Sequence, residues 1–365
     1  MDRQEDGHPV PATPLSRREL LKRAFAAAVV LPPAVCEAGQ AALQQGFGVP
    51  QGRRRRPSFQ RVDPSQIPPY VYRTLPVSHF PALQQEFQRA VTSAGLSRHQ
   101  AFREDIANLS FTLPGDFQSA RSVVVVAAFA KTMYATFRQN GQAYRIMVPP
   151  QYYNDALDAA SLRSIVQKDI IKEPGRRVVD VTERVPLKLL AARSGLGRYG
   201  RNNLIFVDGM GSFNLLYAYL TDQVFPGNTW TELTILDACR RCDHCDRICP
   251  TYCIPRNTFV IDIDKCITLH NEHAGVFPNW ILPSMHHALM GCMRCQVPCR
   301  VNDSFSEVTG DLGEVSEEDT RKILQGNADD ALLTSLQQKL RLPSTVASRA
   351  TVPVLARNLR ALIRA

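Results

Sequence analysis

Four closely spaced cysteines constrain this chain more than any other feature. Cys239, Cys242, Cys245 and Cys249 are followed directly by a proline, so the segment reads C-x2-C-x2-C-x3-C-P. This spacing is typical of the loop that holds a [4Fe–4S] cluster in bacterial ferredoxins, where the fourth cysteine binds the neighbouring cluster. The motif therefore predicts two clusters and a second group of cysteines.

The second group is present further along the chain. Cys266 stands alone, and Cys292, Cys295 and Cys299 form another run. Arg300 follows this run where a second Cys-Pro pair would place a proline. The ferredoxin pattern divides the eight thiols into two sets of four. We assign Cys239, Cys242, Cys245 and Cys299 to the first thiol set, and Cys249, Cys266, Cys292 and Cys295 to the second thiol set.

Two other cysteine arrangements are less consistent with this spacing. Four cysteines within so short a run are too crowded to pair as unstrained disulfides. Zinc knuckles bring two C-x2-C pairs from separate loops and do not form one continuous run that ends in Cys-Pro. Cys36 and Cys253 are left over. We expect Cys253 to be a small buried packing residue.

The length and composition fit a globular protein of about two domains. The chain has 365 residues, 44% of them hydrophobic, and a net charge of +9. No apolar run is long enough for a typical transmembrane helix. Part of the positive charge lies in the first 70 residues, and the remainder is too small to indicate nucleic-acid binding by itself.

The first 69 residues read as a targeting segment and a linker. Within residues 1–40, the run Ser16–Lys22 contains Arg17-Arg18 and resembles a twin-arginine export motif, and a short apolar stretch follows at 24–31. Export of an already folded protein suits one that carries iron–sulfur clusters. The alternative is a basic cytoplasmic tail. We expect residues 41–69, which contain four successive arginines, to be a linker.

The remaining chain predicts an α+β fold in three parts: 70–224, 225–305 and 306–365. The β-branched run at 122–129 is typical of a strand buried on both faces. Other strands are expected at 178–181 and 204–207, and at 214–220, where a short helix is the alternative. A hairpin is expected over 131–148, across Asn140-Gly141. Helices are expected at 80–94, 154–171 and 185–193. The cysteine segment has little regular structure beyond a strand at 259–263, and after a loop at 304–311 helices are expected at 316–326, 328–341 and 351–364.

A glycine-rich stretch at 194–203 follows one of these helices. It contains G-x-G-x-x-G, but a dinucleotide-binding motif must leave a strand and enter a helix. Here a helix precedes the glycines and a strand pattern follows, so we reject a nicotinamide site. The glycines either let the backbone approach a large flat ligand or cap the helix without any ligand.

Several segments together resemble the epoxyqueuosine reductase and reductive dehalogenase superfamily. They are Ala191–Asn203, Gly211-Ser-Phe213 and Leu220-Thr-Asp222, followed by the double cysteine motif, and the resemblance covers about 105–305. It implies a cobalamin-dependent reductase in which two clusters pass electrons to a corrinoid bound by the α/β domain. The residues that match the family's corrinoid-contacting loop are Gly195, Gly197, Gly200, Asn202 and Asn203.

The resemblance also suggests two proton donors. Epoxyqueuosine reductases use an aspartate that precedes the glycine loop, and the nearest counterpart here is Asp180, although its surroundings differ from the family pattern. Dehalogenases use a tyrosine, for which Tyr199 is the candidate. A surface aspartate at a strand end is the simpler interpretation of Asp180.

Three function classes follow. The first is a corrinoid-containing iron–sulfur reductase, served by an electron donor of the ferredoxin or flavodoxin type, that reduces a small molecule or a modified nucleoside. The second is a two-cluster electron carrier without a corrinoid. The third is an enzyme that binds transfer RNA, to which the modest positive charge gives little support.

Overall fold

The computed structural model describes residues 63–93, 100–154, 157–227, 229–255 and 260–364. The targeting segment, Cys36 and most of the linker lie outside these residues. The described part of the linker is folded, since a 3-10 turn at Pro64–Gln66 precedes Ile67, whose side chain is buried in the core. Regular packing therefore begins before Tyr70, where we expected the body to start.

A four-stranded antiparallel sheet forms the centre of the molecule. Its order is β1-β2-β8-β5, so β1 and β5 lie at its edges. The strands are β1 (Tyr70–Pro76), β2 (Ser122–Phe129), β5 (Val178–Asp180) and β8 (Asn214–Thr221). The first seven residues of β2 are buried, which confirms the strand expected from its β-branched run.

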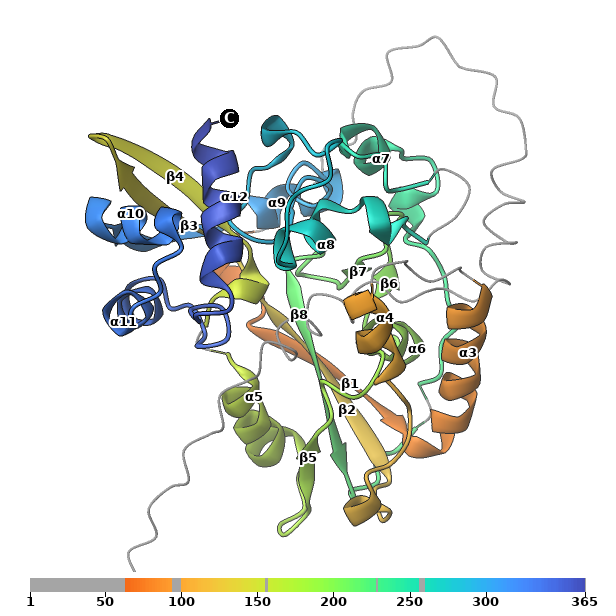
Figure 1. Ribbon diagram of the computed structural model, residues 1–365. Helices are drawn as coiled ribbons and strands as arrows, with labels where there is room; N and C mark the ends of the chain where they lie inside the picture. Colours follow the sequence, from red (N-terminus) through yellow and green to blue (C-terminus); the bar gives the residue numbers. More distant parts are fainter. Residues whose placement is uncertain (1–62, 94–99, 155–156, 228, 256–259, 365) are drawn as a thin grey trace, which may run out of the picture.

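Helices cover both faces of this sheet (Figure 1). Val123, Val125 and Ala127 of β2 pack in one core with the helices α3 (Phe80–Ser93), α4 (Gln100–Ala107) and α6 (Leu187–Arg193). The alternate β2 residues face α5 (Ala159–Ile165) in another core. The helix expected over 154–171 begins only at Ala159, and after Ile165 it continues as a π-helical turn at Val166–Ile170.

A second sheet joins distant parts of the chain. The hairpin of β3 (Thr132–Gln139) and β4 (Gln142–Val148) turns through Asn140 and Gly141, both at positive φ, as the sequence predicted. Strand β9 (Thr309–Val315) pairs with β3 in parallel. We had expected a loop over 304–311, so the first part of β9 corrects that prediction.

The C-terminal helices pack against this second sheet. They are α10 (Glu317–Gln325), α11 (Asp330–Lys339) and α12 (Val352–Arg364), and they confirm the three helices expected there. Together with β3, β4 and β9 they enclose a separate hydrophobic core. The hairpin that the sequence assigned to the 70–224 part therefore packs with the C-terminal part. The boundaries at 224 and 305 stay predictions.

The cysteine segment has little regular structure, as expected. Its helices are α7 (His244–Ile248) and α8 (Ile267–Glu272), and α9 (Asp303–Ser306) ends it. The described residues 260–263 form no strand, so the strand expected at 259–263 is wrong in that part. Cys239, Leu269 and Met293 share the core of the first sheet, so this segment is not an isolated module.

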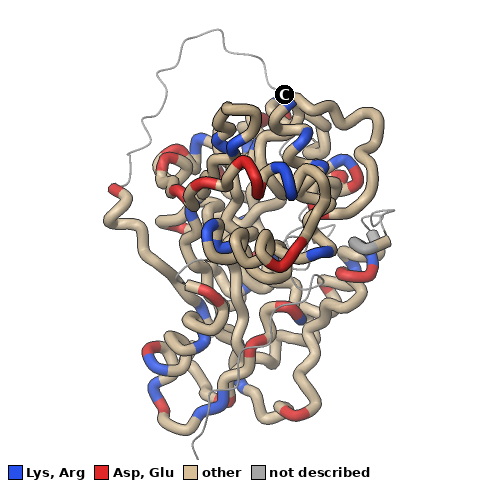
Figure 2. Tube along the Cα trace, turned by 60° about the vertical axis from the view of Figure 1, so that its left-hand side comes forward, with Lys and Arg blue, Asp and Glu red and all other residues tan. Residues whose placement is uncertain are grey.

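Two short strands complete the regular structure. Strands β6 (Arg198–Tyr199) and β7 (Ile205–Phe206) form a small hairpin directly after α6. Basic and acidic residues are both scattered along the described chain (Figure 2). Among the described residues, no helix has the length and apolar character needed to cross a membrane. The whole is a mixed fold of helices and sheets.

Candidate metal centre

The structure brings the four cysteines of the first thiol set together. Burial, together with the charges of Cys239, Cys242 and Cys299, raises the pKa of Cys245 to about 12. Burial also raises the pKa of Cys299 to about 11, and that thiol is influenced by Cys239 and Cys242 in turn. Such electrostatic effects require charges that lie near one another, so Cys299 lies near a run that begins sixty positions earlier in the sequence.

The second thiol set is also assembled. Burial, together with the charges of Cys266 and Cys249, raises the pKa of Cys292 to about 12. Burial raises the pKa of Cys295 as well, and this thiol is influenced by Cys292, Cys266, Cys245 and Cys249. The influence of Cys245 on Cys295 means that the two thiol sets are neighbours.

The donor chemistry of these residues fits two iron–sulfur clusters. Eight thiols in two neighbouring sets of four match the ligand requirement of two cubes, and bound iron keeps such buried thiols deprotonated. In the parts of the chain that the structure describes, no three His, Cys, Asp or Glu side chains converge as a single metal ion would require. A four-iron cluster needs a wider arrangement, because each thiolate binds a different iron.

The loop after β6 connects the α/β body to both thiol sets. Arg201 donates from Nε to the carbonyl oxygen of Cys242 at 2.7 Å and from Nη2 to that of Cys239 at 3.0 Å. Asn202 donates to the carbonyl oxygen of Cys295 at 3.2 Å. Both side chains are 5% exposed. Sequence reasoning did not identify Arg201, because its importance depends on contacts with residues forty positions away.

A second contact joins the body to the end of the cysteine segment. The Ser212 amide donates to Oδ1 of Asn302 at 3.0 Å, and Nδ2 of Asn302 donates to the Ser212 hydroxyl at 2.8 Å. A β-carbon at Gly211 would lie 2.3 Å from the same Asn302 oxygen. The Gly211-Ser-Phe213 stretch, which carries part of the family resemblance, is therefore shaped to contact this segment.

The glycines of the corrinoid-like loop pack against the chain itself. A β-carbon at Gly197 would lie 2.5 Å from Ile205, and one at Gly200 would lie 2.3 Å from the ring of Phe206. Gly195, at φ +72°, faces Thr231 at 3.0 Å. The space beside all three α-carbons is therefore filled by side chains, and these contacts explain the glycines without a ligand.

Two asparagines of the same loop are held from within the protein. Asn203 is fully buried at φ +61°, and its backbone carbonyl and side-chain oxygen accept from the Lys188 ammonium. Burial lowers the pKa of Lys188 to about 7, while the charges of Cys295 and Cys266 oppose this shift. A buried amine thus lies beside the second thiol set. The Oδ1 atom of Asn202 is buried without a hydrogen-bond partner.

The two proposed proton donors lie in different surroundings. Asp180 is exposed at the end of β5, where its carboxylate accepts from the amide of Thr182 at 2.8 Å. Tyr199 is fully buried in β6, and burial raises the pKa of its hydroxyl, with the charge of Glu86 adding to the effect. The structure does not bring Asp180 and the thiol sets into any described contact.

A buried acid beside the second thiol set escaped the sequence analysis. Glu272, at the end of α8, accepts a hydrogen bond from the Tyr152 hydroxyl, and its other oxygen has no partner. Burial raises the pKa of Glu272 well above its usual range, and the charges of Cys266 and Asp105 add to this. Burial therefore disfavours the charged form of this carboxyl group. No sequence motif marks this pairing across 120 positions.

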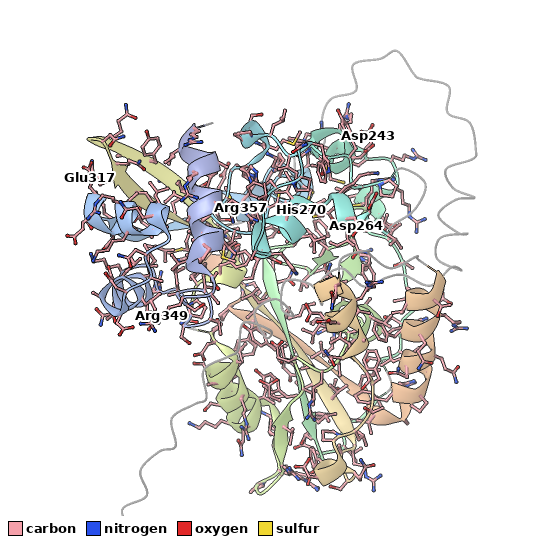
Figure 3. The ribbon with its side chains drawn as sticks, in the orientation of Figure 1. Asp243, Asp264, His270, Glu317, Arg349 and Arg357 are labelled. Atoms are coloured by element: carbon pink, nitrogen blue, oxygen red, sulfur yellow. The ribbon has the colours of Figure 1, made fainter. Side chains whose placement is uncertain are left out.

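The last helix fixes the chain that follows Cys266. Arg357 of α12 reaches over α8 (Figure 3) and donates to the carbonyl oxygens of His270 at 2.7 Å and His273 at 2.8 Å. Its guanidinium group also lies 3.9 Å from the centre of the Phe277 ring. The C-terminal helices thus support the loop that carries the second thiol set.

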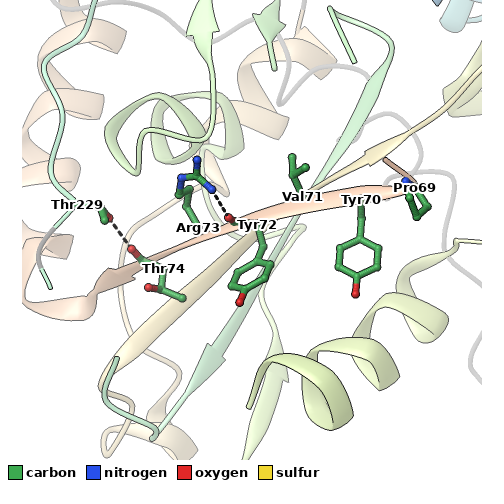
Figure 4. Close-up of a pocket in the computed structure, with 7 residues that line it drawn as sticks. All are labelled: Pro69, Tyr70, Val71, Tyr72, Arg73, Thr74 and Thr229. Atoms are coloured by element: carbon green, nitrogen blue, oxygen red, sulfur yellow. Dashed lines mark hydrogen bonds between the residues drawn. The ribbon is translucent and has the colours of Figure 1, made fainter. Parts of the chain in front are cut away.

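A shallow depression lies elsewhere, along the edge strand β1 (Figure 4). It measures about 650 Å³ and is formed by residues 69–74 and Thr229. The Thr229 hydroxyl donates to the carbonyl oxygen of Thr74 at 2.6 Å. None of the residues that line it is a cysteine, so it is separate from the thiol sets.

These features define a class: a mixed helix-and-sheet body joined to a cysteine-rich segment with two neighbouring thiol sets. Sequence comparison shows that the chain is related to the epoxyqueuosine reductases. It is 33% identical to the Escherichia coli K12 enzyme over 121 residues, 33% of this chain and 30% of that protein. It is 27% identical to the Bacillus cereus enzyme over 227 residues, 59% of this chain and 57% of that protein. No protein-family model matches the chain.

Solved structures show the same fold. The epoxyqueuosine reductase of Streptococcus thermophilus superposes with a TM-score of 0.57 at 15% identity, covering 80% of this chain and 76% of that one. An epoxyqueuosine reductase solved with an epoxyqueuosine-modified tRNA stem loop gives 0.55 at 17% identity, with 80% and 76% covered. The chain spans between about a third and just over half of the length of the curated relatives it matches.

Proposed function

We propose that this chain is an iron–sulfur oxidoreductase that passes single electrons through two [4Fe–4S] clusters to reduce a substrate. The observation that carries the proposal is the grouping of eight thiols into two neighbouring sets, with Cys245 close enough to influence Cys295. Adjacent clusters ligated in this crossed pattern provide a short electron path. The kinship with epoxyqueuosine reductases supports an enzyme.

The residues around the thiols suit this role. Arg201 places a positive charge beside the first thiol set and orders its loop through two carbonyl oxygens. Lys188 places a buried amine, which is a hydrogen-bond donor, beside the second thiol set. Positive charge and hydrogen bonds near a cluster stabilise its more negative, reduced state. Burial of Cys239 and Cys249 limits water access.

A corrinoid is the electron acceptor that the family resemblance implies. When bound, it would supply a cobalt centre able to accept single electrons. The glycines assigned to it do not form a cradle here, because Ile205, Phe206 and Thr231 fill the space beside them. We therefore derive no step through a corrinoid, and the same contacts favour the second candidate, a two-cluster electron carrier.

The substrate class also follows from kinship. One related reductase has been solved with an epoxyqueuosine-modified tRNA stem loop, which supports a modified nucleoside. The twin-arginine motif at Arg17-Arg18 supports export, and with it a small molecule outside the cytoplasm. We propose the export route together with a ferredoxin- or flavodoxin-type electron donor. Cell fractionation of the full chain and of a variant with both arginines changed to lysine tests the route.

Metal analysis tests the function. The protein is produced without oxygen and with cobalamin supplied, and iron and cobalt are measured for each chain. We expect about eight iron atoms, as two four-iron clusters require. Cobalt near one atom for each chain would support the reductase, and iron without cobalt would support the carrier. Fewer than about four iron atoms would contradict both.

One cysteine variant tests the ligand sets directly. Cys242→Ser should remove the electron paramagnetic resonance signal of one cluster and leave the other partly formed. Cys266→Ser should do the same for the other cluster. Two intact signals in either variant would show that the ligand assignment is wrong.

A further inference from the structure

A ninth cysteine lies against the second thiol set. The Sγ atom of Cys253 is 3.4 Å from that of Cys249, and the same thiol is hydrogen-bonded to Cys266. Its side chain is 4% exposed, and it packs with Ile254 in a small core that includes four thiols of the cysteine segment. The contact distance fits a hydrogen bond in which sulfur is both donor and acceptor.

The backbone between Cys249 and Cys253 directs this thiol. Tyr252 has φ +52°, a left-handed conformation that is unusual for a tyrosine, and its amide donates to the carbonyl oxygen of Cys249 at 3.2 Å. The carbonyl oxygen of Cys253 accepts from the Asp262 amide at 2.7 Å. The turn is therefore closed on both sides and returns the Cys253 side chain to Cys249. The Tyr252 side chain itself is 73% exposed, so its packing does not explain the turn.

The contact between Cys253 and the second thiol set favours a neutral thiol at this position. Four thiolates already complete one cube, which leaves Cys253 without an iron. A further negative charge in contact with two ligand thiolates would be repelled by both. The neutral S–H group can instead donate to one of them.

We propose that Cys253 donates an S–H···S hydrogen bond to one ligand sulfur of the second cluster and so raises the reduction potential of that cluster. The inference rests on the proposed function, because it requires the clusters. Reduction adds one electron to the cluster, and a donor at a ligand sulfur stabilises the added negative charge. Thr251, whose hydroxyl lies 3.5 Å from Cys249 Sγ, lies near the same sulfur. Cys253 is thus a positioning residue that tunes the second cluster, in addition to packing as the sequence suggested.

Redox titration of the intact protein, followed by electron paramagnetic resonance, tests this role. Cys253→Ala should lower the potential of one cluster and leave the other unchanged. We expect about a tenfold lower ratio of reduced to oxidised second cluster at a fixed potential, which corresponds to 59 mV for one electron. Cys253→Ser keeps a donor and should shift it less. Ile254→Val is the matched control, since it alters the same packing without removing a donor and should leave both potentials unchanged.

Several outcomes would overturn the inference. An unchanged potential in Cys253→Ala would show that the hydrogen bond does not affect the reduction potential of the second cluster. An equal shift in Ile254→Val would assign the effect to packing. Loss of about four iron atoms in both Cys253→Ala and Cys253→Ser would make Cys253 a ligand. If the alanine variant does not fold, Cys253→Val provides the same measurement. Failure of the wild-type protein to bind two clusters would refute the proposed function instead.

Discussion

Replacing Arg201 with methionine should loosen the first cluster far more than the second. The arginine makes two buried hydrogen bonds, to the carbonyl oxygens of Cys242 at 2.7 Å and Cys239 at 3.0 Å. A hydrogen bond from a charged group contributes about 1.5–3 kcal/mol, and methionine would leave both carbonyl oxygens without this donor. Packing of the methionine offsets part of the loss. We expect the loop to open more easily by about 2–4 kcal/mol.

The assay is the rate at which a chelator removes iron. If iron leaves through local opening of the loop, a change of 2–4 kcal/mol accelerates the release by about 30- to 900-fold. Each cluster is followed by its own spectroscopic signal in protein kept free of oxygen. The second cluster, which Arg201 does not contact in this way, should lose iron at nearly the wild-type rate.

Arg198→Met is the matched control. Arg198 lies three residues earlier, is largely exposed and pairs with Asp237 at 3.3 Å. Exposed ion pairs of this kind contribute about 0–1 kcal/mol, so the rate should change by less than about fivefold. Equal acceleration in the two variants, or equal acceleration of both clusters in Arg201→Met, would refute the argument that Arg201 specifically holds this loop.

Two further changes test the body of the protein. Glu86→Gln removes the partner of Arg193 in a nearly buried ion pair and should lower the free energy of unfolding by about 3–5 kcal/mol. Glu314→Gln, at an exposed ion pair, should lower it by less than about 1 kcal/mol. The midpoints of denaturant unfolding compare the two variants. Burial lowers the pKa of His286 from 6.5 to about 4, so between these values the unfolded chain binds a proton that the folded chain does not. The free energy of unfolding is therefore unaffected by this histidine above pH 6.5, and it falls by about 3 kcal/mol as the pH decreases from 6.5 to 4. His286→Asn should therefore flatten the decline of the unfolding midpoint between pH 6.5 and 4, and an unchanged slope would contradict this assignment.

Elements with strong local signals could be predicted from the sequence. The buried β-branched run of β2, the Asn140-Gly141 turn and the helix start at Ser316 each appear where they were expected, because neighbouring residues alone determine them. Strand β9 was not expected, because most of its residues are polar or glycine and only Leu312 and Val315 are buried. Its pairing with β3 joins segments far apart in the sequence, which no local pattern reveals.

The candidate site, like the fold, could be predicted from the sequence only in part. Spacing alone suggested which thiols should meet, since ferredoxin-type ligation depends on a short motif. Spacing did not identify Arg201, Lys188 or the Tyr152–Glu272 pair, whose roles arise from contacts made after folding. The glycine loop was interpreted mainly as a ligand surface, and its contacts in the folded chain are with Ile205, Phe206 and Thr231.

The position of the glycine loop explains its glycines without a ligand. Gly197 and Gly200 let β6 and β7 pair closely, and this hairpin presents Arg201 and Asn202 to the carbonyl oxygens of both thiol sets. A side chain at Gly200 would push Phe206 away and move the two residues with it. The residues that carry the family resemblance thus hold the cysteine segment against the body. An iron–sulfur carrier and a corrinoid reductase both need this junction, so the resemblance by itself does not distinguish them, and the cobalt content does.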